Sequence, residues 1–397
     1  MRIFWLPFIV AIALIVGIDW LLSRALWKRG KTSVRVLAII NVLATVATLA
    51  ACVITFTTNY SGKPLYAANM AASARALLAF LVVFVPKLVW SILYVLGSIK
   101  WLNYDVRVLL KLAAAAMGIV TFVAMLIGSV WTPYSTQVNE IELSYSELPE
   151  SFDGYRIVHI SDWHLGCYGG DTTFVSQCID EINALKPDMV CFTGDLVSLT
   201  AIEATPFEPL LARLKTRDGI YSVLGNHDYA HYMRGLSEIE QEADVQQLIT
   251  IQEIAGWTLL NNEHAIVSRG NDSIAVVGTA NYGDPPFPVY GDYGAATGGL
   301  GNEFKIHLQH NPYMWHKAIV GKTDAHLTLS GHTHAMQLVI NMFGCRLSPA
   351  SWRYDEWGGL YAEGEQSLYV NTGLGMVGPP LRVGVKPEIT LITLKHK

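Results

Sequence analysis

The sequence has little charge, no histidine before residue 159 and no paired-cysteine motif. Charged residues make up 15% of its 397 residues, which is too few for an ordinary soluble enzyme. The five cysteines are scattered and form no Cys-x-x-Cys motif, so the pattern of a zinc ribbon and that of a disulfide framework are both absent. We therefore expect small buried thiols. Internal repeats and low-complexity segments are lacking as well.

Charge and histidine divide the chain into two parts. Up to Trp131 there are 12 Lys and Arg against 2 Asp and Glu, whereas the remainder holds 16 basic and 31 acidic residues. All 12 histidines lie at or after His159. A nucleic-acid partner would require clustered Lys and Arg in the larger, acidic part, so we expect no nucleic acid as partner.

The front part contains four apolar segments that are long enough to span a bilayer: Ile3–Trp27, Val36–Thr58, Ala76–Ile99 and Val108–Trp131. A cleaved signal peptide would account for only the first of them. The sequence therefore predicts a transmembrane region of four helices over residues 1–131, a polar linker over 132–154 and a third segment over 155–397 that folds as a separate domain.

Lys87 lies near the middle of the third apolar segment. An unpaired lysine at that depth costs about 2.5–3.5 kcal/mol. Either Lys87 turns into the helix bundle toward Asp19, or the third segment does not span the membrane.

The basic residues of the loops predict the orientation of these helices. The second loop has only Lys63 and Arg75, and no Lys or Arg occurs between Trp131 and Arg156. Because loops rich in Lys and Arg stay in the cytoplasm, we expect a multi-pass protein of the cell membrane with its C-terminal domain outside the cytoplasm. The basic residues of the first and third loops are Arg24, Lys28, Arg29, Lys31 and Arg35, and Lys100, Arg107 and Lys111.

Beyond the linker, short β-branched runs alternate with helical stretches, which predicts an α/β domain with helices outside its sheets. Phe343–Gly384 is rich in glycine and aromatic residues and predicts a long irregular loop with closing strands. The predicted strands are Arg156–Ile160, Met189–Thr193, Ile220–Leu224, Ile274–Val277, Lys305–Leu308 and Leu327–Leu329, and the predicted helices are Thr172–Leu185, Glu208–Thr216 and Glu238–Ala255.

Five of these strands end on polar side chains of the kinds that bind metals. Loops at the carboxyl ends of strands in open α/β sheets converge on one crevice, so these side chains should meet. Carboxylate, amide and imidazole donors without a thiolate suit Mn²⁺, Fe or Zn²⁺. The donors outnumber the needs of one ion, which predicts two divalent ions with one shared carboxylate. They are Asp162, His164, Asp195, Asn226, His310, His332 and His334.

The order Asp-x-His, Gly-Asp, Gly-Asn-His-Asp, His and Gly-His-Thr-His resembles the signature of calcineurin-like metallophosphoesterases over about Tyr155–Leu394. The resemblance is closest to the membrane-anchored bacterial branch with YkuE- and YaeI-type phosphodiesterases, although Ala335-Met336 stands where many YkuE-like members have Gly-Gly. It implies a four-layer αββα sandwich with a dimetal site at the sheet edge.

Matching the motifs assigns a role to each residue. One ion would be held by Asp162, His164, Asp195 and His334, and the other by Asp195, Asn226, His310 and His332. By the same resemblance, His227 is a catalytic histidine that binds no metal, and Asp228 orients it.

The resemblance and the membrane region together predict hydrolysis of a phosphodiester or pyrophosphate bond by attack of a metal-activated hydroxide. The tether favours a lipid-linked substrate or another envelope metabolite, with membrane lipids as neighbours. Two alternatives remain open: a UDP-2,3-diacylglucosamine-type pyrophosphatase of lipid A synthesis, and a non-catalytic membrane sensor or transporter with a phosphate-binding domain. The sequence leaves open the natural substrate, the preference for monoesters or diesters, the metal and the oligomeric state.

Overall fold

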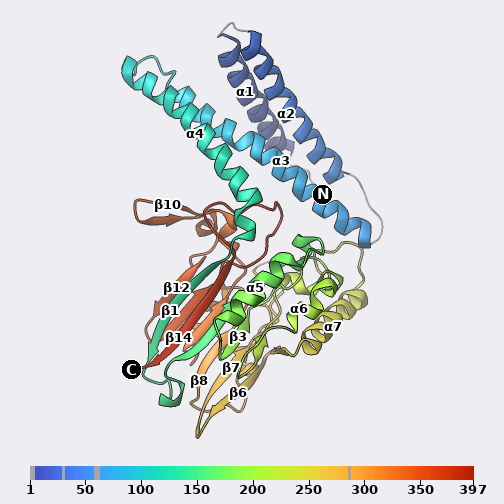
Figure 1. The fold of residues 1–397 in the computed structure, drawn as a ribbon, viewed down its shortest axis with the longest axis vertical. Coiled ribbons are helices and arrows are strands. Elements are labelled where there is room, and N and C mark those ends of the chain that lie inside the picture. The colour runs from blue at the N-terminus through green and yellow to red at the C-terminus, as the bar shows by residue number, and fades with distance from the viewer. Residues whose placement is uncertain (1–4, 29–31, 58–62, 285–287) are drawn as a thin grey trace. The chain divides into compact units, whose positions relative to one another are not determined.

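The computed structural model of the protein describes residues 5–28, 32–57, 63–284 and 288–397. The chain divides into two compact units, drawn together in Figure 1. The first comprises Met1–Val130 with Gly378–Leu381, and the second Trp131–Val377 with Arg382–Lys397.

The first unit consists of long apolar helices. Among the described residues, three stretches are long and apolar enough to cross a membrane: Arg35–Thr55, Tyr66–Leu96 and Tyr104–Tyr134. The first predicted span is also helical, although its start at Ile3 lies outside the described residues and it is not one of the three stretches. The prediction of four spans is therefore confirmed for three. The helices are α1 (Trp5–Trp27), α2 (Thr32–Thr57), α3 (Lys63–Leu96) and α4 (Tyr104–Val130).

Lys87 faces the interior of this helical unit. Its Nζ lies 3.0 Å from Asp19 Oδ1 on α1 and donates a hydrogen bond of 3.1 Å to the carbonyl oxygen of Asn41 on α2. The side-chain amide of Asn41 donates to the same Asp19 oxygen at 3.1 Å. Helix α3 continues through Pro86, next to Lys87. The lysine is thus paired inside the bundle, as one of the two sequence-based alternatives required.

The second unit is built on two six-stranded sheets. In the first sheet the order is β1-β14-β2-β3-β4-β5, and β2 to β5 run parallel. In the second the order is β12-β13-β9-β8-β7-β6, with parallel inner strands and antiparallel edges. The first sheet comprises β1 (Gln137–Tyr145), β2 (Tyr155–Ile160), β3 (Met189–Phe192), β4 (Ile220–Ser222), β5 (Thr258–Leu259) and β14 (Glu388–His396). The second comprises β6 (Glu263–Arg269), β7 (Asp272–Gly278), β8 (Phe304–Leu308), β9 (Leu327–Ser330), β12 (Gly359–Glu363) and β13 (Gln366–Val370).

Strand β1 lies within the segment expected to be a linker. It pairs in parallel with β14 along its whole length, from Gln137 opposite Glu388 to Tyr145 opposite His396. Its partner is about 250 residues away in the sequence, which a local pattern cannot reveal. The first strand and the last strand therefore close the same sheet.

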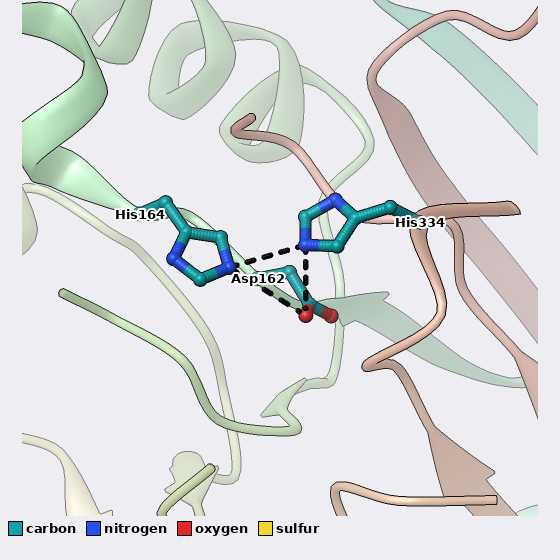
Figure 2. A group of neighbouring side chains, drawn as sticks. All are labelled: Asp162, His164 and His334. Carbon is teal, nitrogen blue, oxygen red and sulfur yellow. Dashed lines mark hydrogen bonds and ion pairs between the residues drawn. The ribbon is translucent and has the colours of Figure 1, made fainter. Parts of the chain in front are cut away.

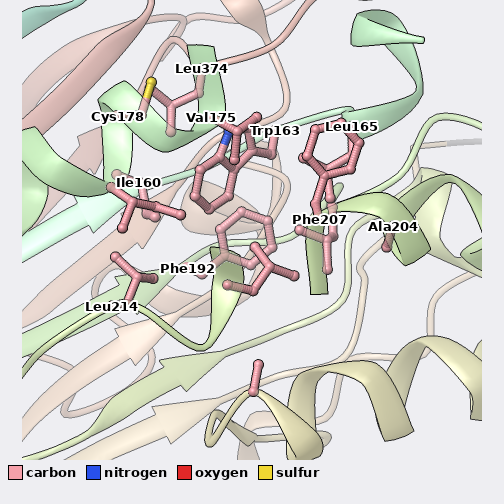
Figure 3. Close-up of a cluster of buried hydrophobic side chains, with 14 of the residues drawn as sticks. Ile160, Trp163, Leu165, Val175, Cys178, Phe192, Ala204, Phe207, Leu214 and Leu374 are labelled. Atoms are coloured by element: carbon pink, nitrogen blue, oxygen red, sulfur yellow. The ribbon is translucent and has the colours of Figure 1, made fainter. Parts of the chain in front are cut away.

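Alternating side chains of the two sheets fill two cores. Inward residues such as Ile157, Ile306 and Leu329 pack between the sheets. Outward residues of the first sheet, such as Val158 and Phe192, pack under helices α5 (Thr173–Ala184) and α7 (Glu238–Ile254), as Figure 3 shows in part. The outer face of the second sheet is covered by the single π-helical turn Trp315–Ile319 and by α8 (Tyr293–Ala296). These layers confirm the predicted α/β sandwich.

One predicted helix is much shorter than expected. Helix α6 spans only Glu208–Leu211, whereas the sequence predicted a helix to Thr216. The side chain of Asn183 on α5 explains the early end. Its amide donates to the carbonyl of Arg213 at 2.9 Å, and its oxygen accepts the backbone N–H of Lys215 at 2.8 Å. The Arg213 carbonyl and the Lys215 N–H thus bond the Asn183 side chain and not other turns of a helix, and the chain continues toward β4.

The Lys87–Asp19 pair generates a prediction. Asp19→Leu leaves a buried ammonium group without its carboxylate, and breaking a buried pair in this way costs about 3–5 kcal/mol. We expect a clearly lower midpoint of thermal aggregation for the purified full-length protein in detergent. The double variant Asp19→Leu/Lys87→Met should recover most of the loss. A double variant as unstable as Asp19→Leu alone would show that the two charges do not stabilise each other.

Candidate metal centre

The carboxyl ends of five strands bring the predicted ligands together. β2, β3 and β4 of the first sheet lead to Asp162, Asp195 and Asn226, and β8 and β9 of the second lead to His310 and His332. Gly331 allows the two sheet edges to approach, because a Cβ at this position would collide with Ser161 Oγ and Asp162 Oδ2. All seven predicted ligands consequently lie in one site.

The first group of donors is Asp162, His164 and His334, shown in Figure 2. His334 Nε2 lies 3.2 Å from Asp162 Oδ1 and 3.1 Å from His164 Nε2. His164 Nε2 is 3.9 Å from the same Asp162 oxygen. All three residues are buried, and their donor atoms face one point.

The second group is Asp195, His310 and His332, with Asn226 beside them. His310 Nε2 lies 3.2 Å from Asp195 Oδ2, 3.2 Å from His332 Nδ1 and 3.0 Å from Asn226 Oδ1. Four donor atoms from four different loops thus surround one position.

Asp195 lies between the two groups. Its Oδ2 is 3.2 Å from His310 Nε2 and 3.5 Å from His164 Nε2, while its Oδ1 accepts the backbone N–H of His227 at 2.8 Å. Asp195 Oδ2 is therefore close to donors of both groups. Burial by itself raises the pKa of Asp195, but the neighbouring His310 and His227 outweigh it and hold the pKa well below its usual range.

Hydrogen bonds on the far sides of the rings fix which nitrogen faces the site. His310 Nδ1 lies 2.7 Å from the carbonyl oxygen of Thr193, so Nδ1 carries a proton and Nε2 faces the site. Burial lowers the pKa of His310, but the adjacent Asp195 outweighs it and raises the pKa to about 9, so Nε2 must give up a proton before it can bind a metal. His332 Nε2 lies 2.9 Å from the Tyr354 hydroxyl, whose proton goes to Asp284 Oδ2 at 3.2 Å. His332 therefore donates from Nε2 and presents Nδ1 to the site.

The donor set fits metal ions better than a metal-free network. Asp162 Oδ1 is buried and has no hydrogen-bond partner, although it is a carboxylate oxygen in the middle of the first group. His164 Nε2 and His334 Nε2 lie 3.1 Å apart, close enough to bind one ion together. Burial and the neighbouring His310 lower the pKa of His332 to about 3, which keeps its ring neutral, as a ligand requires. Cations between these atoms would satisfy all of them.

The backbone of the site is strained. Five of the seven candidate ligands have positive φ angles: Asp162 (50°), His164 (45°), Asp195 (58°), His332 (71°) and His334 (48°). Left-handed backbone at residues other than glycine costs about 1–2 kcal/mol each. Such strain persists where the surrounding structure imposes it, and it concentrates at functional sites.

His227 forms a third possible metal-binding group with His164 and Asp195, and the backbone holds one of its ring nitrogens. Its Nδ1 is 2.7 Å from the carbonyl oxygen of Ser198, and its ring stacks on Tyr232 at 4.2 Å between centroids. The sequence assigned this orienting contact to Asp228, but in the structure the contact comes from Ser198. The Asp228 carboxylate instead accepts backbone N–H groups of Asp195, Leu196, Val197 and Gly225 at 2.8–3.2 Å. Asp228 thus holds the Asp195 loop.

Sequence reasoning did not find the outer network of Asp284, Tyr354 and Arg382. Asp284 accepts hydrogen bonds from Tyr354, from Arg353 at 2.9 Å and from the Asn311 side chain at 3.1 Å. The buried Arg382 lies with Nη2 3.3 Å from His334 Nδ1 and binds three backbone carbonyls of the loop from Thr372 to Gly375. Nothing in the local sequence connects Tyr354 or Asp284 to His332, so the pattern could not indicate this network.

Two aromatic residues near the first ligands have no exposed face for substrate. Trp163 is fully buried, and Tyr168 lies in the same core with its hydroxyl bonded to the carbonyl of Leu374 at 3.2 Å. Both residues therefore pack in the core and do not contact substrate.

Comparison with known proteins identifies the domain. The model of the calcineurin-like phosphoesterase family matches residues 155–336. The metallophosphoesterase YkuE of Bacillus subtilis is 32% identical, over 66% of this chain and 87% of its own length. This chain belongs to the calcineurin-like phosphoesterase family. Its members are hydrolases of phosphoester bonds, which agrees with the donor geometry.

Two further relatives concern the membrane and the substrate. A Danio rerio transmembrane protein with a metallophosphoesterase domain is 32% identical over 70% of this chain, which spans only 62% of that relative. The UDP-2,3-diacylglucosamine pyrophosphatase LpxG of Chlamydia trachomatis is 29% identical, over 62% of this chain and 86% of its own length. The transmembrane relative and the three apolar stretches indicate that this metallophosphoesterase is a membrane protein.

The Tyr354 hydroxyl generates the second prediction. Burial and the adjacent Asp284 raise its pKa, so it remains a donor to Asp284 and an acceptor for His332 Nε2–H. Tyr354→Phe removes this support, and loss of such an outer partner weakens metal affinity by about 10–100-fold. Competition with a fluorescent chelator measures the affinity. Tyr290→Phe, whose ring stacks on Tyr229, is the matched control and should bind metal normally. Equal affinity of Tyr354→Phe and Tyr290→Phe would contradict the role of Tyr354.

Proposed function

We propose that this protein is a membrane-anchored dimetal phosphoesterase that hydrolyses a phosphodiester or pyrophosphate bond in a lipid or another envelope metabolite. The observation that carries the proposal is the pair of donor groups that meet at Asp195. One ion would be bound by Asp162, His164, Asp195 and His334, and the other by Asp195, Asn226, His310 and His332. Mn²⁺, Fe and Zn²⁺ suit this set of oxygen and nitrogen donors.

Two bound divalent ions would supply Lewis acidity to the phosphoryl group and to water. The protein's own residues hold the donors in place for that chemistry. Thr193 O and Tyr354 fix the ring orientations of His310 and His332, and Asp228 fixes the Asp195 loop by its backbone amides. Because these contacts fix the donors in advance, the donors themselves need little rearrangement for the reaction.

His227 is the proposed general acid. The Ser198 carbonyl holds its Nδ1–H, so Nε2 is the nitrogen available to protonate the leaving oxygen. The half-buried ring lies edge-on to His164 at 4.8 Å between centroids, next to the first donor group. Asp228 supports this step indirectly. Its carboxylate accepts the backbone N–H of Val197, and the next residue, Ser198, holds the His227 ring.

The similarity to the chlamydial enzyme supports a lipid-linked substrate and keeps a UDP-2,3-diacylglucosamine-type pyrophosphatase as the second candidate. A purely binding role as a sensor or transporter is less well supported. A domain that had lost catalysis would be expected to lose ligands, whereas all seven are present and converge.

The experiment that tests the proposal is an assay of the purified full-length protein with Mn²⁺ on diesters, monoesters, lipid phosphates and UDP-2,3-diacylglucosamine. Hydrolysis of diesters or lipid pyrophosphates that a chelator abolishes supports the proposal. Hydrolysis restricted to the UDP-linked lipid favours the second candidate. Binding of phosphate compounds without hydrolysis of any of them would favour the non-catalytic sensor or transporter.

The shared carboxylate generates the third prediction. Asp195→Asn weakens both groups at once, so we expect loss of at least one metal and a fall in activity of several orders of magnitude. Elemental analysis and turnover of the same sample check both results. Asp171→Asn, at an exposed carboxylate, is the matched control. Two metals and near-normal turnover in Asp195→Asn would disprove the shared ligand.

The proposed acid generates the fourth prediction. His227→Ala should keep both metals and slow turnover by about 10²–10⁴, as loss of a general acid does. His231→Ala removes an exposed histidine four positions later and should leave both quantities unchanged. Loss of metal in His227→Ala would make His227 a ligand, and an unchanged rate would remove it from catalysis.

The orientation of the protein generates the fifth prediction. If α1 also spans, the basic loops between α1 and α2 and between α3 and α4 are cytoplasmic, and Lys397 lies outside. Arg29 and Lys31 of the first loop lie outside the described residues. A phosphatase reporter active only outside the cytoplasm should be active when fused at Lys397. If a reporter that fluoresces only in the cytoplasm is fluorescent when fused at Lys397, the predicted orientation is wrong. That result would favour the UDP-2,3-diacylglucosamine-type pyrophosphatase.

A further inference from the structure

The hairpin of β10 (Ile340–Met342) and β11 (Cys345–Leu347) belongs to neither of the large sheets. It forms a two-stranded sheet of its own and stands away from the strands of the second unit in Figure 1. All six of its strand residues are exposed, although a hairpin of this length has no core to stabilise it. Its apolar members include Ile340, Met342 and Leu347, each about half exposed.

The turn of the hairpin presents an aromatic ring at an unfavourable backbone angle. Phe343 is 95% exposed and has φ 51°, and Gly344 after it has φ 79°. Two positive φ angles between paired strands match the tight hairpin turn that asparagine and glycine normally occupy. Phenylalanine at such an angle costs about 1–2 kcal/mol. Exposing its ring to water adds a further cost, so a partner for the tip is expected.

The charges around the hairpin differ from those of the rest of its unit. From Ala335 to Tyr354 the sequence contains no Asp or Glu but two arginines, in an otherwise acidic part of the chain. Arg353 pairs with Asp284 at 2.9 Å, so Arg346, exposed on β11, is the cation that the hairpin itself presents. Trp352, 89% exposed, lies in the same segment. Exposed tryptophan and arginine beside apolar side chains are typical of protein that contacts the interface of a bilayer with anionic lipids.

The segment between the last apolar helix and the second unit is short. Only residues 131–136 separate the last apolar helix from β1, and six residues span at most about 20 Å. A tether this short keeps the second unit at the bilayer, so even a weak second contact would be occupied.

We propose that the β10–β11 hairpin is a second membrane contact that inserts Phe343 into the lipid interface of the bilayer that holds the helices. This contact does not depend on the proposed hydrolysis. It adds a consequence, however, because the hairpin follows directly after the ligand loop that ends in His334. Lipid contact at the hairpin would hold the rim of the metal site against the membrane surface and give it access to lipid-linked phosphates.

The test uses the full-length protein in nanodiscs of phosphatidylcholine and phosphatidylglycerol. Cys345, the exposed cysteine of the hairpin, is labelled with an environment-sensitive fluorophore. Lipids with a nitroxide near the glycerol end of the acyl chain then quench any label at the interface. The control carries Cys345→Ser with Ile239→Cys, which places the label at an exposed apolar residue on α7.

We expect several-fold stronger quenching at Cys345 than at Ile239→Cys, and weaker quenching at Cys345 when Phe343→Ser is added. Equal quenching at the two positions overturns the proposal. The proposal is also overturned if shielding of the Cys345 label from water increases with protein concentration and cross-linking yields dimers. The hairpin would then contact a second copy of the chain. The readout involves no turnover, so failure of the proposed activity would leave its outcome unaffected.

Discussion

The buried carboxylates of Asp162 and Asp195 can both stay ionised in one site only if positive charge lies close to them. Desolvation opposes ionisation of both groups, yet the surrounding histidines keep both carboxyls ionised. The histidines in turn lie at hydrogen-bond distance from one another, as the Nε2 atoms of His164 and His334 do. Cations bound by the two donor groups would satisfy these requirements together. The strained backbone, the glycine at the sheet junction and the outer hydrogen bonds all serve to hold this arrangement against its electrostatic cost.

The predicted strands and all seven candidate ligands could be located from the sequence, because each ligand directly follows an apolar run that forms a parallel strand. Contacts between distant segments could not. The pairing of β1 with β14, the Tyr354–His332 hydrogen bond and the Ser198 contact of His227 join segments with no shared pattern. Asp228 was misjudged for a related reason: its place next to His227 suggested a side-chain contact, while the tight turn directs its carboxylate to backbone amides.

Ala335 and Met336, which stand where many YkuE-like proteins have Gly-Gly, lie in a strained turn. His334, Ala335, Met336 and Gln337 all have positive φ angles, so this turn takes the backbone conformation that a Gly-Gly pair adopts without strain. The chain retains the turn and carries its cost immediately before the exposed hairpin. Strain at the ligand loop and exposure at the hairpin thus occur in one continuous segment. A metal site and a membrane contact on the same segment would suit an enzyme whose substrate lies at the lipid surface.

The central claim is that one carboxylate joins two metal ions. Electron paramagnetic resonance of the full-length protein loaded with Mn²⁺ tests it most directly, because ions about 3.5–4 Å apart couple their spins. The account predicts two Mn²⁺ per chain and the spectrum of a coupled pair. A single ion per chain, or two ions with the spectrum of isolated Mn²⁺, would contradict it.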